Sequence, residues 1–196
     1  MLDVREWENY SKGRVANSEW CPIFPLEDDS LVDAMTDYAK ENLNDGKDIY
    51  IICNSGKRGA EKATGVLRDA GIEPTSIYTV EGGAEALGKE NGALTTDRTE
   101  ENIDWKYVSG KDAVDKVGDK DVQFLDVRDD DTYKAGHLKG TLQCSLKEFD
   151  TPEAQTEMYN LAKDKMDKDE PVYILCYSGN KCSKKQTISV MKDDRI

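Results

Sequence analysis

Histidine is nearly absent from this chain of 196 residues, in which His137 is the only one. One imidazole cannot act both as a catalytic base and as a metal ligand, and no cluster of further metal-ligating residues surrounds it. These shortages exclude a histidine-rich metal centre. We therefore predict that His137 has a structural role and that the protein needs no metal.

Basic residues are also in short supply, because 27 lysines and arginines face 40 aspartates and glutamates, for a net charge of −13. Nucleic acids and anionic membranes bind basic surfaces, so we expect neither as the main partner. Long apolar runs are missing too. None approaches the roughly 20 residues that span a membrane, so we expect no membrane insertion of this chain.

Paired cysteines are not indicated either, because the chain has five, an odd number. An odd number argues against a closed disulfide framework, and we expect buried or catalytic thiols instead. Cys21 and Cys144 follow short extended runs and are expected in the core. Cys182 occupies a crowded helix start, where a small packed residue is favoured over a redox partner for Cys176.

A signal peptide is also lacking, so we expect a cytoplasmic protein. The alternative is an exported protein whose signal is missing from a fragment. It rests on Met1, which stands directly before residues 2–5. That segment looks like the middle of a strand, and a natural start there would be unusual.

The most informative segment that is present runs from Cys53 to Arg58. Residues 48–52 before it are mainly apolar and β-branched, which predicts a buried strand. Residues 59–71 after it repeat alanine and leucine at helical spacing and end on a glycine, which predicts a helix. The sequence thus predicts a cysteine at a strand end, in a tight loop that leads into a helix.

That position favours a reactive thiol at Cys53. The free N–H groups and the dipole of a helix N-terminus favour negative charge, so the thiol should ionise easily. The thiolate is the nucleophilic form of cysteine. Lys57 and Arg58 add positive charge at the rim, and the loop should therefore meet a small anionic substrate.

Three motifs resemble the rhodanese-type sulfurtransferases. Residues 53–58 match the pattern Cys-x-Ser-Gly-x-Arg of that family's active-site loop, and residues 77–83 are similar to its last strand and Gly-Gly turn. Residues 125–140 resemble its second strand and the Gly-His turn that follows. Together these motifs span most of the chain, in the family's order.

The chain also contains an internal repeat. Residues 2–5 match residues 125–128, and Cys53 matches Cys176, at one offset of 123 residues without a gap. Further matched pairs are Tyr10 and Tyr133, Gly13 and Gly136, Cys21 and Cys144, Ser55 and Ser178, and Gly56 and Gly179. One unit has been duplicated, and both copies keep the loop cysteine.

Alternating strands and helices then predict the architecture. We expect an α/β protein of two repeated rhodanese-like three-layer α/β/α domains, each with a parallel sheet. Domain 1 should comprise residues 1–90 and lack the family's first strand. A polar linker should cover residues 91–103, and domain 2, residues 104–196, should lack the last strand, so both domains are expected to be truncated at one end.

The resemblance implies which residues form the two sites. Cys53 and Cys176 would be catalytic. The substrate-binding loops would consist of Asn54, Ser55, Gly56, Lys57 and Arg58 in the first copy, and of Tyr177, Ser178, Gly179, Asn180 and Lys181 in the second. Lysine lacks the planar fork of arginine, so the loop of Cys176 is the weaker candidate.

The resemblance also implies a two-step sulfur transfer. The Cys53 thiolate would take the outer sulfur of a small anionic donor such as thiosulfate, or of a persulfide, and become a cysteine persulfide. A thiol or cyanide would then accept the sulfur. No metal or organic cofactor would be required.

Two alternatives stay open. The first is a persulfide carrier, sensor or sulfur-binding module without turnover. The second is a cysteine-dependent phosphatase, because cell-cycle tyrosine phosphatases use a similar fold with a loop one residue longer. Only four residues separate Cys53 from Arg58, and this shorter loop should enclose a sulfur atom and exclude a phosphate.

Two expectations concern pairing. Arg5 should pair with Glu8, and Arg128 with Asp131, to tie a strand end to its turn. The strand expected at residues 105–109 has no neighbour in its own copy, whereas residues 77–80 present an open edge. We predict parallel pairing between these two segments, either within one chain or exchanged between two chains; the exchanged form would be a homodimer through open sheet edges.

Overall fold

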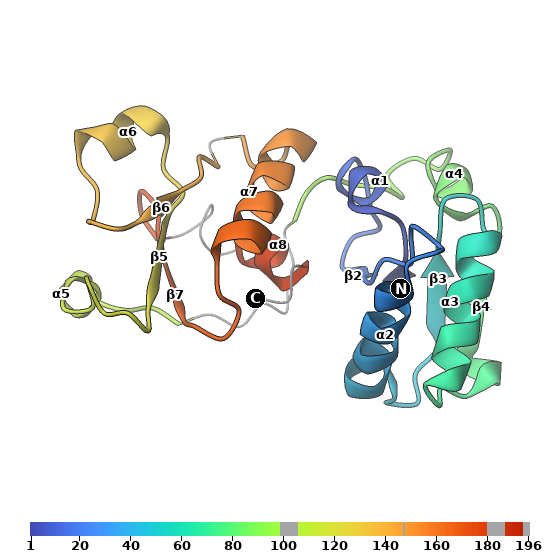
Figure 1. The fold of residues 1–196 in the computed structure, drawn as a ribbon. Coiled ribbons are helices and arrows are strands. Elements are labelled where there is room, and N and C mark those ends of the chain that lie inside the picture. Colours follow the sequence, from blue (N-terminus) through green and yellow to red (C-terminus); the bar gives the residue numbers. More distant parts are fainter. Residues whose placement is uncertain (99–105, 147, 180–186, 194–196) are drawn as a thin grey trace. The chain divides into compact units, whose positions relative to one another are not determined.

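The computed structural model describes residues 1–98, 106–146, 148–179 and 187–193. The chain divides into two compact units, Met1–Thr96 and Asp97–Ile196. Figure 1 shows strands and helices alternating along the chain in both.

Unit 1 contains a four-stranded parallel sheet with the strand order β2-β1-β3-β4. Its elements, in chain order, are β1 (Leu2–Asp3), α1 (Trp7–Ser11), β2 (Glu19–Trp20), α2 (Asp29–Tyr38) with a π-helical turn (Ala39–Leu43), β3 (Ile49–Ile52), α3 (Arg58–Asp69), a 3₁₀ turn (Pro74–Ser76), β4 (Ile77–Thr79) and α4 (Gly83–Leu87). The β3 register places Ile51 beside Leu2 of β1 and beside Thr79 of β4.

The core of unit 1 lies between the sheet and the helices α2 and α3, which run side by side (Figure 1). Ile49 and Ile51 of β3 pack into one apolar cluster with Met35 of α2 and Leu67 of α3. Helical spacing puts these residues on the inner stripe of each helix. Because this cluster holds both ends of the loop after β3, it fixes where Cys53 lies.

Unit 2 repeats the central part of this arrangement with a three-stranded parallel sheet, ordered β6-β5-β7. Its described elements are α5 (Gly110–Val114), β5 (Gln123–Asp126), α6 (Asp130–Ala135), β6 (Leu142–Gln143), α7 (Pro152–Lys165), β7 (Val172–Leu175) and α8 (Ile188–Asp193). Leu125 lies beside Leu142 and Ile174, as Leu2 lies beside Glu19 and Ile51. The registers match at the offset of the sequence repeat, which confirms the predicted fold class of two repeated α/β units with parallel sheets.

A buried ion pair joins each central strand to its turn, although with a different partner from the predicted one. Arg5 pairs with Asp3 at 2.7 Å and donates to the carbonyl of Gly13, while Glu8 pairs with Lys12. Unit 2 repeats this with Arg128 and Asp126 at 2.6 Å. The predicted pairs with Glu8 and Asp131 are wrong, because the fully buried aspartate needs the cation that an exposed glutamate does not.

On each side of the boundary between the units, the chain is held by hydrogen bonds within its own unit. Thr95 exchanges two backbone hydrogen bonds with Arg14, at 2.8 and 3.0 Å, inside unit 1. Arg98 lies fully buried in unit 2, where it donates to Gln155 at 2.5 Å, to Ser189 at 3.3 Å and to the Asp193 carboxylate. The polar sequence of residues 91–103 is typical of a linker. No pattern in it indicated that Arg98 would be buried.

The strand expected at residues 105–109 is not found in residues 106–109, the part of this range that the structure describes. Residues 106–109 form no strand, and Tyr107 is 66% exposed; Trp105 lies outside the described residues. Among the described strands, β4 pairs only with β3. Ser109 caps α5 by accepting a hydrogen bond from the Asp112 N–H. The pairing of residues 105–109 with residues 77–80 would join the two units, and it stays a prediction. A homodimer through the open edge of β4 stays a prediction.

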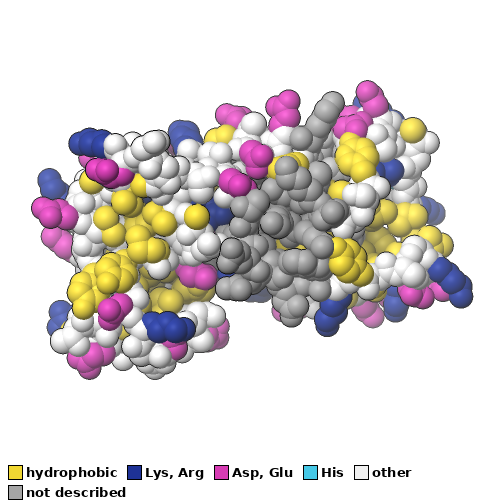
Figure 2. Space-filling view, turned by 180° about the vertical axis from the view of Figure 1, so that it is seen from behind, with side chains coloured by type: hydrophobic (Ala, Val, Ile, Leu, Met, Phe, Trp, Pro, Cys, Tyr) yellow, Lys and Arg dark blue, Asp and Glu magenta, His cyan; other side chains and the backbone are white. Residues whose placement is uncertain are grey.

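Apolar side chains also reach the surface, among the many charged ones (Figure 2). Tyr50 of β3 and Tyr78 of β4 stack with their ring centroids 5.0 Å apart, and they are 42% and 43% exposed. Both are cross-strand neighbours in the register of β3 and β4. They lie on the face of the sheet opposite Ile49 and Ile51, because side chains alternate along a strand.

Candidate active site

Cys53 directly follows β3 and is buried, with 2% of its surface exposed. The chain then turns within four residues, and α3 begins at Arg58. Lys57 is the N-cap residue of this helix, and its side chain makes no cap hydrogen bond. The loop therefore ends on helix amides that its N-cap side chain does not bind, which is the arrangement that binds anions. The predicted strand, loop and helix around Cys53 are all present.

The sulfur of Cys53 accepts a hydrogen bond from a backbone N–H of the loop itself. The N–H of Gly56 points at Sγ with an N–S distance of 3.2 Å. Gly56 has a φ of +70°, in the region that favours glycine, and a Cβ there would lie 2.7 Å from the Val80 carbonyl oxygen. The backbone therefore requires glycine at position 56, because a side chain would be strained at this φ and would collide with the carbonyl of Val80.

The turn through Gly82 and Gly83 also supports the Cys53 loop. After β4, the chain turns through Gly82 and Gly83, and the first amides of α4 then bind the loop: Ala84 N–H donates to the Cys53 carbonyl at 2.8 Å and Glu85 N–H to the Asn54 carbonyl at 3.0 Å. A Cβ on Gly83 would lie 2.3 Å from that Cys53 oxygen. The sequence identified this turn, but its contact with the loop is apparent only in the fold.

The mouth of the site carries both signs of charge. Lys57 and Arg58 are exposed, as the sequence predicted. Glu6, just before α1, was not identified from the sequence, because it stands 48 residues away from Asn54. Its carboxylate accepts hydrogen bonds from the side chains of Asn9 at 2.5 Å and Asn54 at 3.3 Å.

The loop of Cys176 is less enclosed. Cys176 follows β7 but is only half-buried, and Tyr177 after it is 53% exposed. Gly179 has a φ of +62°, like its counterpart Gly56. The described residues of unit 2 contain no counterpart of the Gly82–Gly83 turn. Asn180, Lys181 and Cys182 lie outside the described residues.

The remaining cysteines match their expected places. Cys21 and Cys144 are buried in their units. Burial raises the pKa of the Cys144 thiol to about 12, and the negative charge of Glu157 adds to this effect.

His137 is exposed. Its ring stacks on that of Tyr133, and its Nδ1 forms a hydrogen bond with the backbone carbonyl of Tyr133. These contacts agree with a structural role.

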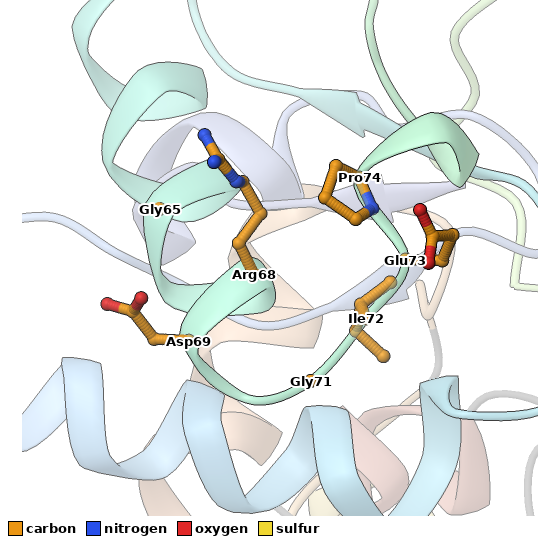
Figure 3. A pocket seen from close by; sticks show the side chains of 7 residues that line it. All are labelled: Gly65, Arg68, Asp69, Gly71, Ile72, Glu73 and Pro74. Atoms are coloured by element: carbon orange, nitrogen blue, oxygen red, sulfur yellow. The ribbon is translucent and has the colours of Figure 1, made fainter.

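A separate pocket of about 550 Å³ opens at the other end of α3 (Figure 3). The residues that line it are Gly65, Arg68, Asp69, Gly71, Ile72, Glu73 and Pro74. No cysteine is among them, and α3 separates this pocket from the loop at its N-terminus. The pocket is therefore not the candidate active site.

The model of the family described as "Rhodanese-like domain" matches residues 1–90 and, a second time, residues 109–193. The chain belongs to the rhodanese-like domain family. The matches cover both units and both loop cysteines, so the duplication recognised in the sequence is a tandem pair of rhodanese-like domains. In the residues that the structure describes, no helix is long and apolar enough to cross a membrane.

Relatives within the family carry different names. A segment of 75 residues is 32% identical to a thiosulfate sulfurtransferase, GlpE, of Coxiella burnetii and covers 38% of this chain and 61% of that protein. A segment of 100 residues is 28% identical to a tRNA uridine(34) hydroxylase of Streptococcus pneumoniae, covering 50% of this chain and 29% of that one. This chain therefore spans less than two thirds of either relative.

Among solved structures, the chain is similar to the 3-mercaptopyruvate sulfotransferase SseA of Escherichia coli. The sequences are 17% identical, the match covers 97% of this chain and 84% of SseA, and the TM-score is 0.34.

Proposed function

We propose that this protein is a sulfurtransferase that moves a sulfane sulfur from thiosulfate or a persulfide to a thiol or cyanide, with Cys53 as the carrier. The observation that carries the proposal is the loop of Cys53. It places a buried sulfur beside the Gly56 N–H and in front of the N-terminus of α3. Such a site accommodates a sulfur anion.

In the first step, the Cys53 thiolate attacks the outer sulfur of thiosulfate. A new S–S bond forms, the old one breaks, and sulfite leaves with its electron pair. The cysteine persulfide that remains carries one negative charge on its terminal sulfur. The N–H groups of the loop stabilise that charge, and Lys57 and Arg58, both exposed at the rim, attract the donor.

In the second step, the acceptor attacks the terminal sulfur of the persulfide. Its bond to Sγ breaks, and Cys53 leaves as the thiolate with which the cycle began. Neither step requires a proton to pass through a histidine, in accord with the exposed and structural position of His137. The name of the Coxiella burnetii relative supports this chemistry.

The two units are proposed to be unequal. Cys53 lies in a loop whose carbonyls are bound by α4, and its sulfur meets a backbone donor. Cys176 is only half-buried, so its sulfur is less enclosed than that of Cys53. A loop held in its productive shape reacts faster than one that must first be ordered.

The test is mass spectrometry of the purified protein after treatment with thiosulfate, followed by cyanide. We expect one added sulfur atom on the peptide of Cys53, and its loss as thiocyanate when cyanide is added. Cys53→Ser should abolish most of this transfer, whereas Cys176→Ser should retain most of it. If both single variants transfer sulfur as fast as the wild type, the catalytic role of these cysteines is refuted.

A parallel assay addresses the alternatives. Hydrolysis of an aryl phosphate that is lost in Cys53→Ser would indicate a phosphatase instead. A persulfide that forms on Cys53 but passes to neither cyanide nor a thiol would indicate a carrier or sensor.

A further inference from the structure

A carboxylate that caps no backbone N–H of its helix lies beside the Cys53 loop. Glu6 stands at the N-cap of α1, but its side chain makes no cap hydrogen bond. Its two oxygens instead accept from Asn9 at 2.5 Å and from Asn54 at 3.3 Å, and Asn9 also donates to the Asn54 side-chain oxygen at 3.2 Å. Asn54 is the residue next to the nucleophile, so this closed ring holds a half-buried negative charge beside the loop.

Unit 2 keeps the same contact with different residues. Asp129 occupies the position of Glu6, and Tyr177 that of Asn54. The Tyr177 hydroxyl bonds the Asp129 carboxylate and accepts from the Asp129 N–H at 2.9 Å. In each copy, therefore, the residue after the loop cysteine touches an acidic side chain. Asp129 also caps α6 by accepting a hydrogen bond from the Thr132 N–H at 2.9 Å, whereas Glu6 makes no cap hydrogen bond, so the carboxylate of Glu6 lacks this structural role.

We propose that Glu6 sets the charge selectivity of the Cys53 site, so that doubly charged sulfur donors are disfavoured relative to singly charged ones. This inference rests on the proposed sulfur transfer. A fixed carboxylate repels a dianion twice as strongly as a monoanion at the same place. Lys57 and Arg58 are exposed at the other end of the loop, where solvent screens them more than it screens a half-buried group.

The substrate class that follows is a singly charged donor, such as a persulfide or a thiosulfonate. The reaction is the same for both classes. Thiolate attack on the outer sulfur forms one S–S bond and breaks another, and the leaving group departs with its electron pair as sulfite from thiosulfate, as a sulfinate from a thiosulfonate or as a thiolate from a persulfide. Thiosulfate and a thiosulfonate differ in charge and in one substituent, so the ratio of their rates is compared between variants.

The experiment compares thiosulfate, a dianion, with methanethiosulfonate, a monoanion, by kcat/KM for sulfur transfer to cyanide. In Glu6→Gln we expect the ratio of thiosulfate to methanethiosulfonate to rise about fivefold at low salt. The gain should shrink at high salt, because counterions screen the carboxylate in the wild type. Asn9→Asp, which adds a second carboxylate to the ring, should move the ratio in the opposite direction.

Two control variants separate charge from structure. Glu6→Asp keeps the charge and should keep a ratio near that of the wild type. Glu8→Gln removes an exposed charge from the same helix, where Glu8 pairs with Lys12, and should leave the ratio unchanged. Because Asn9→Asp predicts the opposite shift, the inference is still tested if Glu6→Gln folds poorly.

The possible outcomes are distinct. Opposite shifts of the ratio in Glu6→Gln and Asn9→Asp would support the inference. Equal changes for both donors, or an unchanged ratio in both variants, would refute it while leaving sulfur transfer intact. A wild type that takes sulfur from neither donor would refute the proposed function, and this inference with it.

Discussion

At the scale of single residues, the surroundings of a sulfur decide what a cysteine can do. Cys53 and Cys144 each lie just past the end of a parallel strand and are both buried. Cys53 faces a loop with the Gly56 N–H 3.2 Å from its sulfur. Cys144 is surrounded by the core of unit 2, and burial raises the pKa of its thiol to about 12. The first is therefore placed to react and the second to pack.

The raised pKa of Cys144 predicts how stability depends on pH. The folded protein keeps this proton up to about pH 12, whereas the unfolded chain releases it near the ordinary pKa of a thiol. Above that ordinary value the unfolded state binds fewer protons, so stability from this group is lost as the pH rises. Urea unfolding at about pH 8 and again near pH 10.5 should therefore show a smaller loss in Cys144→Ala than in the wild type. Equal losses in the two proteins would contradict the assignment.

At the scale of elements, α4 acts as a brace for the active-site loop. Its first amides bind the carbonyls of Cys53 and Asn54, and the turn before it approaches the loop closely at Gly83. Turning these carbonyls toward α4 leaves the N–H groups of the loop to face the sulfur, as the N–H of Gly56 does. The shape of the site thus depends on an element that follows Cys53 by about 30 residues.

Gly83→Ala tests this brace. A Cβ there would lie 2.3 Å from the Cys53 carbonyl oxygen, so the loop must move, and we expect persulfide formation at Cys53 to fall by about tenfold or more. The matched control is Gly71→Ala. Gly71 also has a positive φ, +97°, but a Cβ there meets nothing within 4 Å. That variant should lose about 1 kcal/mol of stability and keep its rate. Similar rates in both variants would show that the brace is dispensable.

At the scale of the whole molecule, the chain consists of two cores, each with its own stabilising contacts. Arg98, just after the boundary between the two units, supplies such contacts in unit 2. Arg98 enters the core of unit 2 and bonds Gln155 of α7 together with Ser189 and Asp193 of α8. Removing one member of a buried ion pair leaves the other charge without compensation and costs about 3–5 kcal/mol.

Arg98→Ala should therefore destabilise unit 2 alone. We expect hydrogen exchange to show lost protection in α7 and α8, while α2 and α3 of unit 1 keep theirs, because the two cores are separate. Lys116→Ala is the control, since it removes a partly exposed ion pair with Asp119 from the same unit and should change little. Equal loss of protection in both units would show that they unfold as one.

The sequence by itself determined the duplication, the parallel α/β architecture and the loop of Cys53. These features are local, because they follow from apolar periodicity, from glycines at turns and from a constant offset along the chain. The sequence also placed Cys21 and Cys144 in the core, where both are found.

Only the tertiary structure decided which distant groups meet. Glu6 lies next to Asn54, 48 residues along the chain, and Arg98 reaches Asp193 of α8. The extended pattern at residues 106–109 produced no strand, because a strand needs a neighbour to satisfy its N–H and C=O groups. Such contacts depend on where the backbone brings chain segments together, which a pattern of neighbouring residues does not encode.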